Sequence, residues 1–297
     1  MSDMQQAAEQ ARVAAGEYDW LATWRDMYDR ERAQAEQFPP PSPENRNDCW
    51  AGQASRFAAA AQRGQQPDGF MRFVLPRLRP TDRVLDIGAG SGRYEPTLAA
   101  AVAEVHALEP SAGMREHLTG RVAEAGLANV RVHGRSWPAE GVPPCDVAIA
   151  AHVLYAVREV GPFLRAMYEA AGRAGFVLLS FRHPSSFVGP FWQRLRGEAR
   201  LPLPGALECL NALYQLGIPA QLARIPMLNR FSYANEDEAL ADLRWRLRLP
   251  AGTADDGALA AAIDELLDRD EQGGLAPRQQ PSHAAVLWWE RAAGEEL

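Results

Sequence analysis

The sequence predicts a doubly wound α/β fold with a mostly parallel, seven-stranded sheet. In the middle of the chain, short and almost wholly apolar segments alternate with helical stretches, which is typical of a parallel sheet covered on both faces. One apolar segment, 83–87 (RVLDI), runs directly into a glycine-rich turn, and open α/β sheets bind ligands at such turns. With 297 residues, 47% of them hydrophobic, the chain can form one large domain with additions or two domains.

The segment before the sheet is predicted to be helical. Helices are expected over 17–32, from Asn47 or Asp48 to about 61, and over 69–78, with a stiff proline-rich connector at 38–43. Trp20, Trp24 and Tyr28 recur every fourth residue and therefore share one helix face. Together with Trp50 and Phe57, this face either forms a lid over a ligand or packs against the sheet.

The remaining elements follow in order. The predicted strands are 83–87, 104–108, 130–133, 146–151, 175–181, 220–225 and 284–289. The predicted helices are 95–102, 111–125, 160–171, 206–216, 236–248 and 256–270, with a loop or short helices over 183–205. The run Arg244–Arg248 is expected to be a solvated helix face with one buried edge.

Composition limits the classes of function. A net charge of −7 and a pI of about 5.5 weigh against broad binding to nucleic acid or an anionic membrane. The sequence contains no lysine, which excludes a lysine Schiff base and a P-loop lysine. Cys49, Cys145 and Cys209 are far apart, so neither a disulfide framework nor a cysteine metal site is predicted. With no long apolar segment and no signal-peptide core, a cytoplasmic protein is expected.

The glycine-rich turn is the main functional signal. Gly88, Gly90 and Gly92 allow a backbone to approach a ligand closely, because glycine has no Cβ and tolerates positive φ. The spacing differs from the dinucleotide fingerprint G-x-G-x-x-G, because Arg93 stands where its third glycine belongs. Glu109 ends the next strand, where a carboxylate can accept hydrogen bonds from both hydroxyls of a ribose.

These segments resemble class I S-adenosylmethionine-dependent methyltransferases of the small-molecule, ubiquinone/menaquinone type. The matching segments are VLDIGAGSGRY (84–94), ALEPSAGM (107–114), CDVAIAAHVLYAV (145–157) and GFVLLSF (175–181). The resemblance implies the Rossmann-like methyltransferase fold, S-adenosylmethionine as cofactor and S-adenosylhomocysteine as product. It divides the chain into an N-terminal helical extension (1–79), a cofactor-binding core (80–182) and a C-terminal part (183–297). The last part would carry a substrate-side loop, the final helix and strands, and inserted helices.

The resemblance also implies roles for cofactor-binding residues. The three glycines would form the turn under the methionine part of the cofactor, with Asp86 orienting that turn and the amino group and Glu109 binding the ribose. Met114 would pack on the adenine, or else belong to the core. Ser136 and Trp137 occupy the place where many members carry an acidic residue for the adenine amino group, and Trp137 either stacks on the ring or packs elsewhere.

Catalytic candidates follow the fourth and fifth strands. His152 and Tyr155 come after the former and His183 after the latter, so all three are expected at the carboxyl edge of the sheet. Methyl transfer depends mainly on positioning, and a base is needed only when the nucleophile carries a proton. A histidine here therefore acts either as that base or as a hydrogen-bonding pocket residue. Cys145, at the opposite end of its strand, is not expected to be a nucleophile.

The expected partner is a small-molecule methyl acceptor, either aromatic or anionic. Oxygen is the preferred acceptor atom, and nitrogen and carbon are left open. Aromatic and arginine residues over 182–200 could bind such a molecule or form a surface loop. Three alternatives stay open: an RNA-modifying methyltransferase, a non-catalytic cofactor-binding module that acts through a partner, and a nicotinamide oxidoreductase. Oligomeric state is left open.

Overall fold

The computed structural model describes residues 18–38, 68–227, 232–250, 255–269, 271, 274–278 and 281–291. Its main sheet contains β1 (Arg83–Ile87), β2 (Glu104–Leu108), β3 (Val130–His133), β4 (Cys145–Ala151), β5 (Ala171–Ser180), β6 (Gln221–Pro226) and β9 (His283–Glu290). In the described residues these form one seven-stranded sheet in the order β3-β2-β1-β4-β5-β9-β6. The first five strands pair in parallel, and β9 runs antiparallel to both β5 and β6.

The predicted fold is therefore confirmed. Because β1 has β2 on one side and β4 on the other, the strand order reverses at β1, and crevices for ligands form at this point of open sheets. The predicted bounds of β1, β2 and β3 are those observed. Strand β5 begins earlier than expected, at Ala171, and Gly175 within it is required for packing. A Cβ on Gly175 would lie 2.0 Å from the ring of Trp289 on β9.

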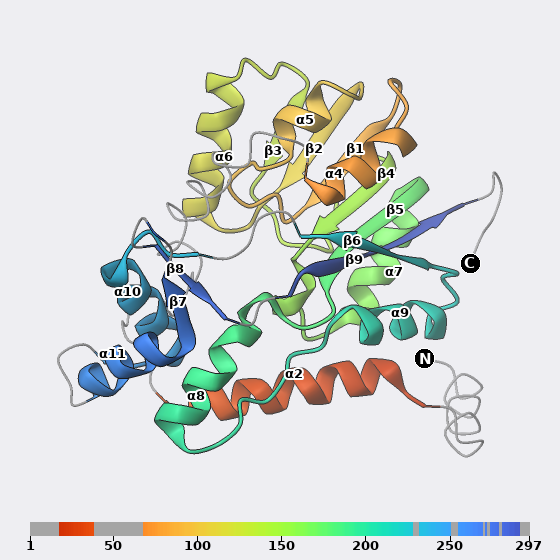
Figure 1. Ribbon diagram of the computed structural model, residues 1–297. Helices are drawn as coiled ribbons and strands as arrows, with labels where there is room; N and C mark the ends of the chain where they lie inside the picture. The colour runs from red at the N-terminus through yellow and green to blue at the C-terminus, as the bar shows by residue number, and fades with distance from the viewer. Residues whose placement is uncertain are drawn as a thin grey trace.

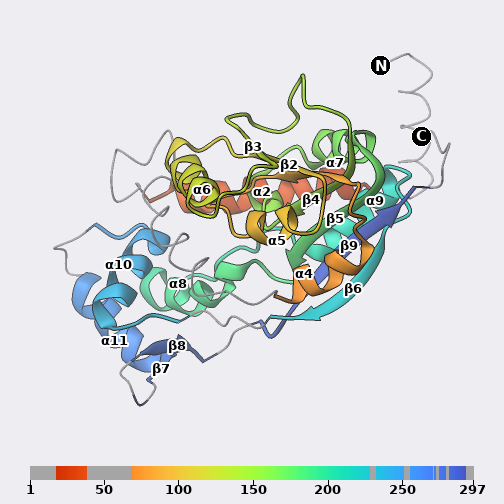
Figure 2. The ribbon, with the colours of Figure 1, turned by 90° about the horizontal axis from the view of Figure 1, so that it is seen from above.

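Helices cover both faces of the sheet (Figures 1 and 2). One face packs against α2 (Trp20–Glu36), α7 (Val160–Ala170) and α9 (Ala206–Gln215); the other packs against α4 (Gly69–Val74), α5 (Glu95–Ala99) and α6 (Ala112–Glu124). Burial on both sides explains why the central strands are almost wholly apolar.

Trp24 fixes α2 to the core. Its ring is fully buried, and its Nε1 donates a hydrogen bond to the carbonyl of Val157 at 2.8 Å. Of the predicted aromatic face on α2, Trp24 and the partly buried Trp20 thus pack against the core. Trp50 and Phe57, and the helix predicted near 47–61, lie outside the described residues.

A second group of elements has its own core. It contains η5 (Pro184–Phe187), α8 (Val188–Arg196), α10 (Glu236–Leu247), α11 (Asp255–Leu266) and the hairpin of β7 (Leu267–Arg269) and β8 (Leu275–Pro277). We call these elements the C-terminal subdomain; Figure 1 shows it beyond the end of the sheet at lower left. Two insertions build it, one after β5 and one between β6 and β9. The helix predicted over 256–270 is too long, because residues 267–269 pair with β8 instead.

Among the described residues, no helix has both the length and the apolar character that crossing a bilayer requires.

Candidate functional site

The glycine-rich turn lies where the sheet order reverses. Gly88, Gly90 and Gly92 have φ values of 75°, 60° and 85°, in the left-handed region that favours glycine. A Cβ on Gly88 would lie 2.6 Å from Cγ2 of Val153, so this glycine lets the loop after β4 pack against the turn. A Cβ on Gly90 would meet nothing within 4 Å among the described residues. The backbone at Gly90 therefore borders open space, as a cofactor-binding turn requires.

Glu109 is tied to this turn. Its buried carboxylate accepts hydrogen bonds from the backbone N–H of Gly90 (2.9 Å, to Oε2) and of Ser111 (2.7 Å, to Oε1). The carboxylate is thus held beside the open face of the turn. The sequence predicts an acid at the end of β2, but not its hydrogen bond to Gly90.

Two buried acids, Asp86 and Glu95, flank the glycine turn along the chain and interact with each other. Burial and the neighbouring Glu95 and Glu109 raise the pKa of Asp86 well above its ordinary value. Burial likewise raises the pKa of Glu95 to about 7. The hydrogen bond that its carboxylate accepts from the Tyr94 N–H lowers the pKa and offsets only part of this rise. Because two adjacent buried carboxylates repel each other, Asp86 and Glu95 together hold a proton near neutral pH. Sequence reasoning missed Glu95, although its place in the first turn of the helix after the glycines was visible.

The residues expected near an adenine lie in two different environments. Met114, in the first turn of α6, is buried, and its N–H donates to Oγ of Ser111 at 3.3 Å. Ser136 is exposed. Trp137 packs edge-on against Phe163 of α7 and donates from Nε1 to the Phe163 carbonyl at 3.1 Å. Packing of Trp137 is thus observed, and its stacking on adenine stays a prediction.

The structure brings the three catalytic candidates together. The Tyr155 hydroxyl accepts a hydrogen bond from the Ser180 N–H (2.6 Å) and lies 3.4 Å from Nδ1 of His152. The Tyr155 ring stacks on His152 with centroids 5.9 Å apart and meets His183 edge-on at 4.5 Å. Burial lowers the pKa of His152 to about 4 and of His183 to about 3, and raises that of Tyr155 to about 12. All three side chains are therefore neutral at pH 7.

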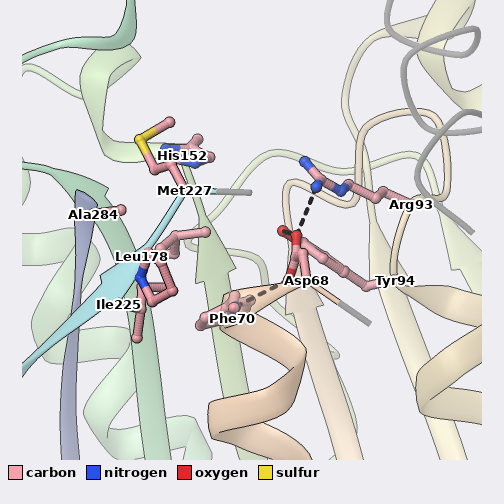
Figure 3. Close-up of a pocket in the computed structure, with 11 residues that line it drawn as sticks. Asp68, Phe70, Arg93, Tyr94, His152, Leu178, Ile225, Met227 and Ala284 are labelled. Carbon is pink, nitrogen blue, oxygen red and sulfur yellow. Dashed lines mark hydrogen bonds and ion pairs between the residues drawn. The ribbon is translucent and has the colours of Figure 1, made fainter. Parts of the chain in front are cut away.

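A pocket opens next to His152 (Figure 3). Its polar lining includes Asp68 and Arg93, joined by an ion pair of 2.6 Å. Its apolar lining includes Phe70, Leu178 and Met227. Two residues link the pocket to the glycine turn. Arg93 directly follows the turn, and His152 precedes Val153, which packs against Gly88. Sequence reasoning missed Asp68, which stands far from the motif, and noted Arg93 only as a departure from the dinucleotide fingerprint.

Comparison with known proteins identifies the family. A family model described as "Methyltransferase domain" matches residues 58–224, more than half of the chain. The chain belongs to this methyltransferase family. The resemblance to class I S-adenosylmethionine-dependent methyltransferases is thereby confirmed, and S-adenosylmethionine is the cofactor of the family.

Individual relatives of this methyltransferase are distant. An uncharacterized protein of Haemophilus influenzae is 26% identical over 240 residues, which are 75% of this chain and 82% of that protein. A ubiquinone biosynthesis O-methyltransferase of Azorhizobium caulinodans is 33% identical over 126 residues, 38% of this chain and 49% of that enzyme. A solved structure of a putative methyltransferase from Bacillus halodurans is 12% identical with a TM-score of 0.49, covering 73% of this chain and 96% of that one.

Proposed function

We propose that this methyltransferase moves the methyl group of S-adenosylmethionine to an oxygen atom of a small organic acceptor. The observation that carries the proposal is the open backbone at Gly90, which is bonded to the Glu109 carboxylate and belongs to a turn that leads directly into Arg93 of the His152 pocket. A turn that can bind the donor and a pocket for a second molecule lie side by side, and methyl transfer needs this proximity.

The proposed roles follow the geometry. Gly88, Gly90 and Gly92 form the backbone cradle, and Glu109 accepts hydrogen bonds from the ribose hydroxyls. Asp86 precedes the turn along the chain, near the position proposed for the amino group. We propose that Met114, Ser136 and Trp137 border the adenine, and that the acceptor enters the pocket bounded by His152 and Arg93.

The remaining alternatives have less support. The O-methyltransferase relative favours oxygen as the acceptor atom, and the net charge of −7 weighs against an RNA substrate. Formation of S-adenosylhomocysteine without a partner protein would exclude a non-catalytic module. We also propose a cytoplasmic location, since the described cysteines, Cys145 and Cys209, are free and buried.

Calorimetric titration tests the cofactor site. S-adenosylmethionine and S-adenosylhomocysteine should bind, and NAD should not. Glu109→Ala should weaken binding by about 1–3 kcal/mol, because the ribose hydroxyls and the Gly90 N–H lose their acceptor. Glu116→Ala, on the exposed face of α6, is the matched control and should leave affinity unchanged. Equal affinities of the unsubstituted protein and both variants for S-adenosylmethionine would show that Glu109 does not bind the ribose.

A further inference from the structure

His152, which lines the pocket, and the neighbouring His183 are both placed to act as hydrogen-bond donors. The Tyr155 oxygen accepts a hydrogen bond from the Ser180 N–H, and its hydroxyl, 3.4 Å from Nδ1 of His152, can donate to that nitrogen. A neutral imidazole that accepts a hydrogen bond at Nδ1 carries its proton on Nε2. His183 is arranged in the same way, since its Nδ1 accepts from the Ser185 N–H at 3.0 Å.

The surrounding groups keep both rings neutral. Withdrawal from water and the adjacent Arg93 lower the pKa of His152, and Asp68 opposes them only in part. Burial, Arg246, His152 and Arg200 all lower the pKa of His183. With the Tyr155 hydroxyl donating to His152 and the Ser185 N–H donating to His183, each neutral ring has an N–H on Nε2 and no free lone pair with which to remove a proton.

Asp68, the acid of the pocket, is already occupied. Its Oδ1 accepts from the N–H groups of Phe70 and Met71 at the start of α4, and its Oδ2 receives the Tyr94 hydroxyl (3.2 Å) and the Arg93 guanidinium. These four contacts take up its lone pairs, and Arg93 balances its charge. The described lining of the pocket thus has no formal net charge and no group placed to act as a base.

This lining restricts the acceptor. An alcohol or a phenol keeps its proton at neutral pH and needs a base, whereas a carboxylic acid is already ionised in water. The sulfonium of the donor carries a positive charge at the reacting atoms, which favours an anionic acceptor. The apolar side chains of Phe70, Leu178, Ile225 and Met227 favour an acceptor with an apolar body.

We propose that the acceptor is a carboxylate with an apolar body, that the product is its methyl ester, and that His152 orients the carboxylate through Nε2–H. This inference rests on the proposed methyltransferase function. A carboxylate oxygen forms a bond to the methyl carbon while the sulfur–carbon bond breaks, and the bonding electron pair stays on sulfur. One negative and one positive charge disappear, and no proton is transferred. Tyr155 is a positioning residue that fixes the tautomer of His152.

The linkage in the product tests the acceptor class. The protein is incubated with methyl-labelled S-adenosylmethionine and a protein-free, small-molecule extract of cells that encode it, and the products are then treated with alkali. A methyl ester releases its label as volatile methanol, which is the expected result. Label that survives alkali in an ether, amine or carbon linkage overturns the inference and leaves the methyltransferase function intact. No transfer from a cofactor that binds would overturn both.

Two substitutions separate a donor from a base. His152→Gln places an amide N–H near the position of Nε2, whereas His152→Asn tolerates the φ of 60° but is too short to reach that position. If His152 is a donor, the His152→Gln variant should be at least about tenfold more active than the His152→Asn variant. Its methyl-transfer rate should also not change with pH across the neutral range. A general-base role predicts that both lose about 10²–10⁴-fold, and that result would overturn the inference.

Nitrogen NMR of labelled histidine gives a readout that does not depend on activity or on these variants. The His152 proton should be on Nε2 at neutral pH, and Tyr155→Phe should populate the other tautomer as well. A proton on Nδ1 in the unsubstituted protein, or titration of His152 near the ordinary histidine pKa, would contradict the arrangement.

Discussion

Single residues in the glycine turn serve two separate purposes. Gly88 lets the loop after β4 pack tightly, while Gly90 leaves the backbone open toward the proposed cofactor. The same residue type therefore supports the fold at one position and the site two residues later. Substitution can separate the two purposes.

Gly88→Ala and Gly90→Ala form a matched pair. Both strain a backbone with positive φ by about 1–2 kcal/mol, but only the first also meets Val153. We expect Gly88→Ala to lower the melting temperature more, and Gly90→Ala to weaken S-adenosylmethionine binding at least about tenfold while remaining folded. Thermal denaturation and calorimetry measure the two effects. A Gly90→Ala protein with unchanged affinity would argue against the cradle.

Glu95→Gln tests the buried acid pair. The pKa of Glu95 is raised to about 7, so the folded state binds more protons than the unfolded state between about pH 4.5 and 7, and stability falls as the pH rises through this window. Glutamine removes that titration. We expect the substitution to stabilise the protein by about 1–3 kcal/mol more at pH 8 than at pH 5, measured by urea unfolding. A difference that does not depend on pH would contradict the shared proton.

At the level of elements, loops and caps link the helical extension to the motif. Asp68 caps α4 and also pairs with Arg93 at the end of the glycine turn. A single carboxylate therefore connects a helix of the extension to the turn. Within the C-terminal subdomain, the run 244–248 was expected to be a solvated helix face with one buried edge, and Arg246 makes contacts inside the subdomain. Its Nε donates to the buried Asp242 at 2.7 Å, and its guanidinium also bonds Ser185.

Asp68→Asn and Asp68→Ala separate the cap from the ion pair. Asparagine is a good N-cap and keeps the acceptor for α4, so it loses only the charge that faces Arg93. Alanine loses both, and we expect it to be less stable than the asparagine variant by about 1 kcal/mol. Equilibrium unfolding in urea measures the difference. Equal stabilities would show that the cap contributes nothing at this position.

At the level of the whole molecule, neutral histidines limit stability in acid. His152 and His183 have pKa values of about 4 and about 3 in the folded state, so the unfolded state binds more protons as the pH falls below the ordinary value of 6.5. Between pH 7 and pH 5 each should cost about 1–2 kcal/mol of stability. His152→Gln should reduce this loss, as measured by urea unfolding at both pH values. An equal loss in both proteins would contradict the lowered pKa.

Local sequence patterns were sufficient to predict the sheet and the positions of Glu109 and of the two histidines that follow strands. The strands are short apolar runs bounded by turns, and Glu109, His152 and His183 follow strands directly, so their common edge could be predicted. The hairpin of β7 and β8 was missed, because each strand has only three residues and is stabilised by its partner rather than by a pattern of its own.

By itself, the sequence determined the fold class, the glycine turn and the family, because these depend on periodicity and on residues close together along the chain. Only the tertiary structure decided that Asp68 meets Arg93, that Glu95 lies beside Asp86, and that the Tyr155 hydroxyl lies beside Nδ1 of His152. Such contacts depend on which side chains the packed core leaves facing each other. Protonation is decided at the same level, since it follows from burial and from neighbouring charges.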